Sequence, residues 1–528
     1  MTILDYALKL TKTSLFCGVG LGLAGTFVAS SVMDTNWYLG AFVVAYFGIQ
    51  LGFSFGNYKA VERLTGYSEL NASDKNDWTK KFMGDTVTPE IGEYFQQHRE
   101  EMKVAVMVVG YREDPDYWRG CLESIRDHAC GDASFGTVRG VYACVDGNSE
   151  NDHFMTDIFH EVFTATNLTT IEEEEEKLDN FSKLSNINLH VVEEDGYKSQ
   201  VREFSHGGKR ETMKRGMDWI QLDGEYDYIL VTDSDTVFLP NAVWSLVKVI
   251  HDDPKNGCAT GTLQIFNRTT ALAKMVNARY LYAFNMERSA MSYAGCMNCC
   301  SGPFSIYRNS VLDEKFLDDF VTQSCCSQRV GPGDDRHLTN LMLMKGYHSK
   351  QSPLSVAMTE SPCTFERFFT QQLRWMRSFY REQYYQILAV PHQSFYLLFV
   401  TIYENLFPYI VVLSFIPTFG LLYETPIQVF YSRILICMGI ILLRTAMLFV
   451  LSGYQWDVLY NIFMLPTYFC ALLPMKVYAL LTLCTQNWMT SDRLLVRKRC
   501  NWDVVGMNVF IVLWNLGYVA MALYRMLK

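Results

Sequence analysis

Two carboxylates with one residue between them follow an apolar run, and this spacing suits a divalent cation. The run YDYILVT covers residues 226–232, and Asp233 and Asp235 come directly after it as DSD. Hard oxygen ligands at the end of a strand can hold Mg²⁺ or Mn²⁺, which then bridges to the phosphates of a diphosphate substrate. The pattern by itself is also typical of a turn with solvated carboxylates. We predict a metal and diphosphate site at these two residues.

A second acid pair lies in a glycine-containing loop, GPGDDR at residues 331–336. The arginine keeps a neighbouring carboxylate ionised, while the adjacent Asp334 raises the pKa of Asp335, and this balance suits a general base. An ordinary acidic turn is the alternative interpretation. We predict that Asp335 accepts a proton during a reaction.

Two motifs with basic residues could hold a diphosphate. In QQLRW at 371–375, Arg374 can bind phosphate oxygens through two hydrogen bonds, and the face of Trp375 can stack on a sugar ring. An amphipathic helix at a membrane surface would show the same residue types. The turn GGKR at 207–210 can approach phosphates closely, but taken alone it is more typical of a surface turn.

The overall composition points to a membrane protein with a large soluble part. The chain has 528 residues, of which 49% are apolar and only 19% are charged. Its 46 basic and 56 acidic residues leave a net charge of −10, which excludes a general nucleic-acid binder. The 15 cysteines lack the paired spacing of a zinc site or a disulfide framework, so we expect reduced thiols.

The soluble part, residues 57–392, is predicted to be an α/β domain. Strand-like runs recur at 104–110, 138–146, 226–233 and 257–266, with polar helical stretches between them. This alternation is typical of a parallel sheet with crossover helices. Asp146, Asp233 and Asp235 stand at the ends of these runs, where open α/β sheets bind their ligands.

Apolar runs on both sides of this domain are long enough to cross a lipid bilayer. Lys and Arg flank the first pair of runs but are absent from the turn between them, which predicts that the α/β domain lies in the cytosol. The run 458–483, interrupted by Pro466 and Pro474, is predicted to be an interfacial or re-entrant helix. The chain thus divides into regions 1–56, 57–392 and 393–528. The five predicted spans are 14–32, 37–56, 395–423, 427–450 and 504–524.

Taken together, the order of these motifs resembles the processive family 2 glycosyltransferases, which include cellulose, chitin and hyaluronan synthases. The chain is most similar to the hyaluronan synthases. The resemblance implies a GT-A-type domain between N- and C-terminal membrane helices, with the C-terminal helices forming a polymer channel. The stretches that carry it are 145–163, 206–213, 278–310, 333–340 and 371–382.

The resemblance also implies a role for each matching residue. A UDP-sugar would bind in the α/β domain, with Mn²⁺ or Mg²⁺ as the cofactor and the nascent polysaccharide as acceptor. Asp335 is implied as the general base, Asp233 as support for the nucleotide sugar and Asp235 as the metal ligand. The implied substrate-binding residues are Tyr111, Glu113 and Asp146 for uridine, Lys209 and Arg210 for the diphosphate, Gln371, Arg374 and Trp375 for the diphosphate and acceptor, Cys299 and Cys300 for the acceptor sugar, and Trp488 in a gating loop.

The sequence leaves the polymer open. Val330 stands where hyaluronan synthases usually have cysteine, and the gating loop reads Trp-Met-Thr at 488–490 instead of Trp-Gly-Thr. One span follows that loop, whereas the family usually has two. Several stretches also resemble the nodulation chito-oligosaccharide synthases. The first reading is therefore a plasma-membrane hyaluronan synthase that uses UDP-GlcNAc and UDP-GlcA. The alternative is a chitin or chito-oligosaccharide synthase that uses UDP-GlcNAc only.

A charged residue inside a predicted span bears on the choice of polymer. Arg444 lies inside the apolar run 434–450, where a charge is costly and usually faces a polar path. A cation in a secretion channel would favour a polymer with carboxylates, although snorkelling or a structural pair would also account for Arg444.

A third reading, a transporter or scaffold with an inactive transferase domain, is disfavoured because every expected carboxylate and the motif tryptophan are present.

Overall fold

The computed structural model describes most of the catalytic region and part of the flanking helices. The described residues are 36–65, 89–163, 190–194, 197–240, 242–418, 438–439, 441–446, 448–449, 455–485 and 502–527. Of the predicted features, Trp488, the span 14–32 and most of the span 427–450 lie outside these residues.

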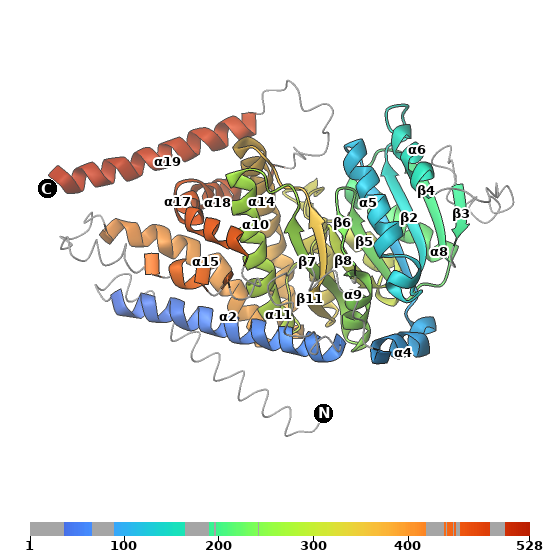
Figure 1. Ribbon diagram of the computed structural model, residues 1–528. Helices are drawn as coiled ribbons and strands as arrows, with labels where there is room; N and C mark the ends of the chain where they lie inside the picture. Colours follow the sequence, from blue (N-terminus) through green and yellow to red (C-terminus); the bar gives the residue numbers. More distant parts are fainter. Residues whose placement is uncertain are drawn as a thin grey trace.

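A nine-stranded mixed sheet forms the centre of the catalytic region, in the order β3-β4-β2-β1-β5-β8-β7-β11-β6 (Figure 1). Strands β4, β2, β1 and β5 run parallel to one another. The prediction of a parallel sheet is correct for the four runs on which it rested, because β7 points the same way as β1, β2 and β5. The sheet is nevertheless mixed, because the unpredicted strand β8 runs antiparallel between β5 and β7. Strands β7 and β11 are again parallel, while β3 and β6 are antiparallel edge strands. The bounds are β1 (Val104–Gly110), β2 (Val138–Asp146), β3 (His190–Glu194), β4 (Tyr197–Phe204), β5 (Tyr228–Asp233), β6 (Val237–Phe238), β7 (Asn256–Ile265), β8 (Phe304–Arg308) and β11 (His348–Thr359), with a separate hairpin of β9 (Ser324–Cys325) and β10 (Gln328–Arg329).

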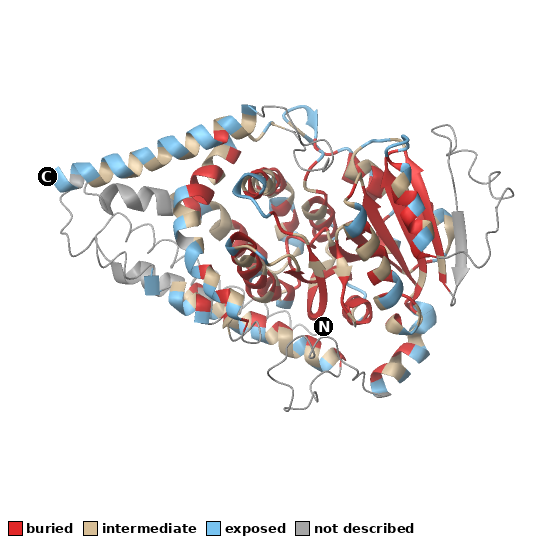
Figure 2. Ribbon diagram, turned by 45° about the horizontal axis from the view of Figure 1, so that its top comes forward, coloured by how far each residue is buried: buried red, intermediate tan, exposed pale blue. Residues whose placement is uncertain are grey.

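Helices cover both faces of the sheet, which explains why the central strands β1 and β5 are largely apolar and almost fully buried. Successive side chains of a strand point to opposite faces. In β1, Val104, Val106 and Val108 enter one core, whereas Ala105 and Met107 enter the other. The buried strands in the interior of the domain are visible in Figure 2. The first core packs against α5 (Pro115–His128), α6 (His153–Val162) and α9 (Ala242–His251), and the second against α8 (Lys209–Asp223), α12 (Glu314–Val321) and α13 (Asp334–Met344).

The helices outside the sheet dock closely onto the catalytic region. In α2, Ser54 Oγ donates a hydrogen bond of 2.8 Å to the carbonyl of Met286. The ring of Tyr46 in α2 stacks on Tyr403 of α15 with centroids 4.0 Å apart.

The remaining helix bounds are α2 (Asn36–Thr65), α4 (Pro89–His98), α10 (Ala271–Tyr282), α11 (Ser289–Tyr293), α14 (Phe365–Ala389), α15 (Phe395–Thr418), α17 (Met464–Thr467), α18 (Leu473–Leu481) and α19 (Trp502–Leu527). Short 3₁₀ or π segments are η3 (Arg99–Glu101), η4 (Gly131–Ser134), η6 (Ala283–Arg288), η7 (Asn309–Val311), η8 (Val390–His392), η9 (Trp456–Phe463) and η10 (Tyr468–Leu472).

Helix α19 extends away from the body of the molecule (Figure 1) and is the clearest candidate for a membrane span. Its segment Trp502–Tyr524 has 23 residues, and 6% of its most apolar window is buried inside the protein. Among the described residues, the second candidate is the pair Trp456–Phe463 and Tyr468–Leu481, which bends by 49°. This bend lies within the run predicted to be interrupted. The full arrangement of spans stays a prediction.

A disulfide joins Cys326, in the β9–β10 hairpin, to Cys484, which follows α18. The expectation that the cysteines are reduced is therefore wrong for this pair. The two residues are 158 positions apart in the sequence, so only the tertiary fold could reveal that they meet. The bond ties the loop before α13 to the chain that follows α18.

Candidate active site

The carboxyl ends of three neighbouring parallel strands form the floor of the site. Strand β2 ends at Asp146 and β5 ends at Asp233, while β1 between them leads directly into Tyr111. Because parallel strands end at the same edge of a sheet, these three residues lie along one edge, where α/β sheets bind ligands. The prediction that Asp146 and Asp233 stand at the ends of strands is confirmed, and their binding roles stay predictions.

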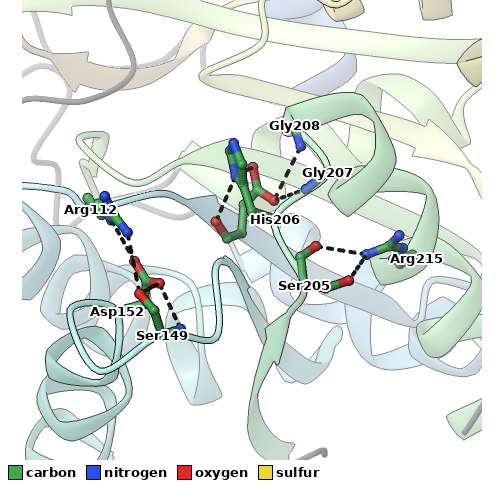
Figure 3. Close-up of polar contacts among 9 residues, drawn as sticks. Arg112, Ser149, Asp152, Ser205, His206, Gly207, Gly208 and Arg215 are labelled. Atoms are coloured by element: carbon green, nitrogen blue, oxygen red, sulfur yellow. Dashed lines mark hydrogen bonds and ion pairs between the residues drawn. The ribbon is translucent and has the colours of Figure 1, made fainter. Parts of the chain in front are cut away.

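Asp146 organises the glycine turn that precedes α8. Its Oδ1 accepts hydrogen bonds from the backbone N–H groups of Gly207 at 3.0 Å and Gly208 at 3.4 Å. Figure 3 shows His206 beside Gly207 and Gly208 at this turn. The Oδ2 atom of Asp146 lies 3.1 Å from Nδ1 of His206, and the His206 ring stacks on Tyr111 with centroids 4.5 Å apart. Two flat rings beside a carboxylate acceptor can bind a planar base that carries N–H groups. Sequence reasoning did not assign His206, although it starts the matched stretch 206–213.

The loop after β1 is held by an ion pair that sequence reasoning also missed (Figure 3). Arg112 has a positive φ of 46°, and its Nε donates to Asp152 Oδ1 at 2.9 Å. Burial raises the pKa of Asp152, but hydrogen bonds from Arg112 and Ser149 outweigh burial and lower it overall. An ionised Asp152 therefore keeps Arg112 in this strained conformation. Tyr111 is in turn fixed beside the strand ends.

Successive residues of the DSD motif differ in burial: the middle side chain is buried and the two aspartates are partly exposed. Ser234 is buried, and its Oγ donates to Glu113 Oε2 at 2.9 Å. Asp233 and Asp235 on either side are half-buried and face away from the core. Glu113 is itself buried and also accepts from the N–H of Asp114 at 2.8 Å. Glu113 thus connects the loop after β1 to the DSD motif.

Lys209 brings the two acidic motifs together. Its Nζ lies 2.6 Å from Asp233 Oδ1 and 3.0 Å from Asp334 Oδ2. Burial lowers the pKa of Lys209, but the two carboxylates outweigh burial and raise it above its ordinary value. A permanent positive charge therefore stands between DSD and GDD, at a point where a phosphate could approach.

The neighbouring Arg210 is turned away from that point. Its Nη1 and Nη2 atoms donate to the carbonyls of Phe320 at 3.3 Å and Pro332 at 3.2 Å. Burial lowers the pKa of Arg210, which is packed within the second core. In this structure Arg210 supports the loop before α13, and Lys209 is the basic residue of the turn that faces the acidic motifs.

Asp335 is the second residue of α13, and its side chain contacts Cys299, one of the two cysteines expected at the acceptor site. Cys299 Sγ donates to Asp335 Oδ2 at 3.3 Å. Burial raises the pKa of Cys299 to about 12, so the thiol keeps its proton and acts as a donor. Thr339 Oγ1 donates to the carbonyl of Asp335 at 2.7 Å and accepts from the N–H of Cys300 at 2.8 Å. These contacts hold the Asp335 carboxylate in one orientation.

Helix α14 adds Gln371, Arg374 and Trp375. Burial lowers the pKa of Arg374, and the carboxylates of Asp334, Asp233 and Asp335 partly offset this effect. The guanidinium is thus within electrostatic range of both acidic motifs. Trp375 packs near Tyr280, with ring centroids 6.3 Å apart. The Gln371 Oε1 atom is buried and has no hydrogen-bond partner among the described residues, so it can accept a hydrogen bond from a ligand.

The donor set at DSD fits a cation that is shared with a substrate. No group of three or more His, Cys, Asp or Glu side chains is poised to hold a metal within the part of the chain that the structure describes. Mg²⁺ commonly takes only one or two protein carboxylates and completes its shell with water and substrate phosphates. Asp233 and Asp235 can supply those carboxylates.

Comparison with known proteins gives the enzyme class of this chain. The profile described as "Glycosyltransferase like family 2" matches residues 184–378. The site and this match define an enzyme of glycosyltransferase family 2. A mannosyltransferase from Pyrobaculum calidifontis, solved with GDP-mannose and Mn²⁺, superposes over 80% of this chain and 97% of its own. Its TM-score is 0.41 and its sequence identity is 13%, so it supports no conclusion about this chain.

The nearer relatives define the family. Hyaluronan synthase 3 from Homo sapiens is 32% identical over 429 residues, covering 79% of this chain and 75% of that protein. Hyaluronan synthase 2 from Homo sapiens is 32% identical over 408 residues, covering 74% of this chain and 70% of that protein. The chain belongs to the hyaluronan synthase family, and the chitin synthase alternative is not favoured.

Proposed function

We propose that this protein polymerises UDP-GlcNAc and UDP-GlcA alternately and exports the resulting polysaccharide across the membrane in which it is embedded. The observation that carries the proposal is the convergence of Lys209, Arg374 and Asp335 around the DSD motif. This arrangement offers two cations for a diphosphate and one carboxylate base for an acceptor hydroxyl. The family relationship supports the choice of polymer.

The proposed reaction is a direct displacement at the anomeric carbon in a GT-A-type domain. Asp335 takes the proton of the acceptor hydroxyl, while Lys209 and Arg374 hold the departing UDP. The uracil stacks on the outer face of the Tyr111–His206 ring pair, next to Asp146. A Mn²⁺ or Mg²⁺ ion held by Asp235 and Asp233 would neutralise charge on the diphosphate. With one base and no carboxylate nucleophile, the anomeric centre inverts, so α-linked donors yield β-linkages.

The proposed organisation keeps region 57–392 in the cytosol, between the membrane helices of 1–56 and the channel-forming region 393–528. The distribution of Lys and Arg around the first pair of apolar runs supports this orientation. Access to cytosolic nucleotide sugars and export through the plasma membrane follow from it. The disulfide between Cys326 and Cys484 opposes this placement, since cytosolic thiols are normally kept reduced.

The decisive experiment offers donors to the purified protein with Mn²⁺ or Mg²⁺. UDP release and polymer formation are measured with UDP-GlcNAc alone, with UDP-GlcA alone and with both. We expect a polymer only with both donors, and we expect hyaluronidase to digest it. A chitinase-sensitive product from UDP-GlcNAc alone would keep the enzyme class and overturn the proposed polymer.

Arg444 provides a separate test of the export path. Its guanidinium carbon lies 3.4 Å from the ring centroid of Tyr282, whose hydroxyl donates to Gln50 Oε1 at 3.1 Å. These groups form a polar seam between otherwise apolar helices. We expect Arg444→Leu to shorten the exported chains at least ~3-fold, because a cation in an apolar helix typically serves a polar path. Product length is measured by gel electrophoresis.

The matched control is Arg444→Lys, which keeps the positive charge and should preserve most of the chain length. If Arg444→Leu makes chains of normal length, Arg444 has no role in the channel and its contact with Tyr282 is purely structural.

A further inference from the structure

The motif QQLRWMRSFYRE ends in Glu382, a carboxylate that the proposed reaction does not use. Its side chain is 2% exposed, and that of His337, which faces it, is 1% exposed. Burying a carboxylate is costly unless several donors compensate for the lost water. Glu382 therefore needs partners on other elements, and those partners show what it connects.

Three buried side chains supply hydrogen bonds to Glu382. Gln323 Nε2 donates to Oε1 at 2.6 Å, and Asn340 Nδ2 donates to Oε2 at 2.9 Å. The Nδ1 atom of His337 lies 3.2 Å from Oε2, while its Nε2 faces the carbonyl of Asp319 at 3.4 Å. Burial raises the pKa of Glu382, but the contacts with His337 and Asn340 outweigh burial and lower it. Glu382 is therefore ionised, and it accepts hydrogen bonds from three buried side chains on other elements.

These partners lie next to the reacting groups. His337 and Asn340 belong to α13, the helix that starts with Asp334 and Asp335. Glu382 belongs to α14 and follows Trp375 by about two helical turns. The loop before α13 is also pressed onto α14: Gly333 has a φ of +93°, and a Cβ atom there would lie 2.0 Å from Ser378 Oγ. The loop before α13 and helix α14 are therefore in close contact at Gly333 and Ser378.

We propose that Glu382 is a positioning residue that locks α13 to α14 and so sets the relative placement of Asp335 and Arg374. The base and the diphosphate-binding guanidinium stand on different helices, and Glu382 is the charged contact that ties those helices together. A displacement of about 1 Å at reacting groups can cost on the order of 10²-fold in rate. This inference rests on the roles proposed above for Asp335 and Arg374.

The test replaces Glu382 in the full-length enzyme and separates kcat from KM. Glu382→Met keeps the length of the side chain but removes both acceptors. We expect kcat to fall by about 10–100-fold, with KM for each UDP-sugar and the affinity for UDP within about 2-fold of wild type. Glu382→Gln retains an acceptor for His337 and Asn340, so it should recover kcat to within about 5-fold.

The controls separate positioning from folding. Glu366→Met changes an exposed carboxylate on the same helix and should leave both constants unchanged. If Glu382→Met fails to fold, Gln323→Leu removes a single donor and should lower kcat by about 3–10-fold with KM unchanged. Normal kcat in the folded variants overturns the inference. So does a parallel loss of UDP binding and kcat that tracks the amount of folded protein.

A parallel assay of Asp335→Asn distinguishes this inference from the proposed function. If Asp335→Asn is as active as wild type, the proposed role of Asp335 as the base fails, and the premise of this inference fails with it. If Asp335→Asn is inactive while Glu382→Met turns over normally, only the positioning role of Glu382 fails.

Discussion

Replacing Asp335 by Asn is expected to leave UDP bound as tightly as in the wild type but to slow polymer synthesis by at least ~10²-fold. The amide can still accept a hydrogen bond from the thiol of Cys299, which lies 3.3 Å from Asp335 Oδ2, so the local structure should persist. It cannot take a proton from the acceptor hydroxyl. UDP release during turnover and UDP affinity at equilibrium measure the two effects separately.

Asp318→Asn is the matched control, because it makes the same chemical change on a carboxylate of α12 that is 57% exposed. It should leave both turnover and UDP affinity unchanged. Near-normal synthesis by Asp335→Asn would reject the assignment of Asp335 as the base. The adjacent Asp334 is a poor substitute, since its carboxylate is buried and paired with Lys209 at 3.0 Å.

The second large effect is expected at Asp235. Asp235→Asn removes one of the two half-buried carboxylates that can hold a divalent cation at the end of β5. Turnover should fall by about 10²–10³-fold, comparable with losing one electrostatic contact to a transition state. The Mn²⁺ concentration needed for half-maximal activity should rise as well. Both quantities come from UDP release measured across a Mn²⁺ titration.

The Mn²⁺ titration decides whether the effect concerns metal binding. Asp127→Asn, at a carboxylate that is 49% exposed and paired with Arg126, controls for the loss of one negative charge. An Asp235→Asn variant with reduced turnover but an unchanged Mn²⁺ requirement would argue against a metal ligand at this position. Activity of the wild type in the presence of a strong chelator would argue against any metal at the DSD motif.

Local sequence patterns determined much of the catalytic domain. The runs 104–110 and 138–146 coincide with β1 and β2, and the run 226–233 contains β5. These strands are buried on both faces and read as continuous apolar stretches, which made them easy to recognise. Their ends carry the acidic residues of the site, so the positions of Asp146 and Asp233 followed from the sequence alone.

Other parts of the fold depend on contacts between distant segments. The short strand β8 runs antiparallel to β5 and β7, and its direction is set by pairing that no local pattern records. The same holds for the disulfide between Cys326 and Cys484. Local periodicity reports which face of an element is buried, but not which element will cover it.

The working geometry of the site was likewise decided by tertiary structure. In the turn 207–210, sequence reasoning treated Lys209 and Arg210 alike, yet Lys209 pairs with Asp233 and Asp334 while Arg210 binds backbone carbonyls. The sequence assigned no role to Glu382, and its contact with His337 exists only in the folded structure. The sequence by itself determined which residue types are present, their order and the family. Only the packing of α8, α13 and α14 around the strand ends decided which charges meet, because electrostatic and hydrogen-bond energies depend on distances between residues far apart in the chain.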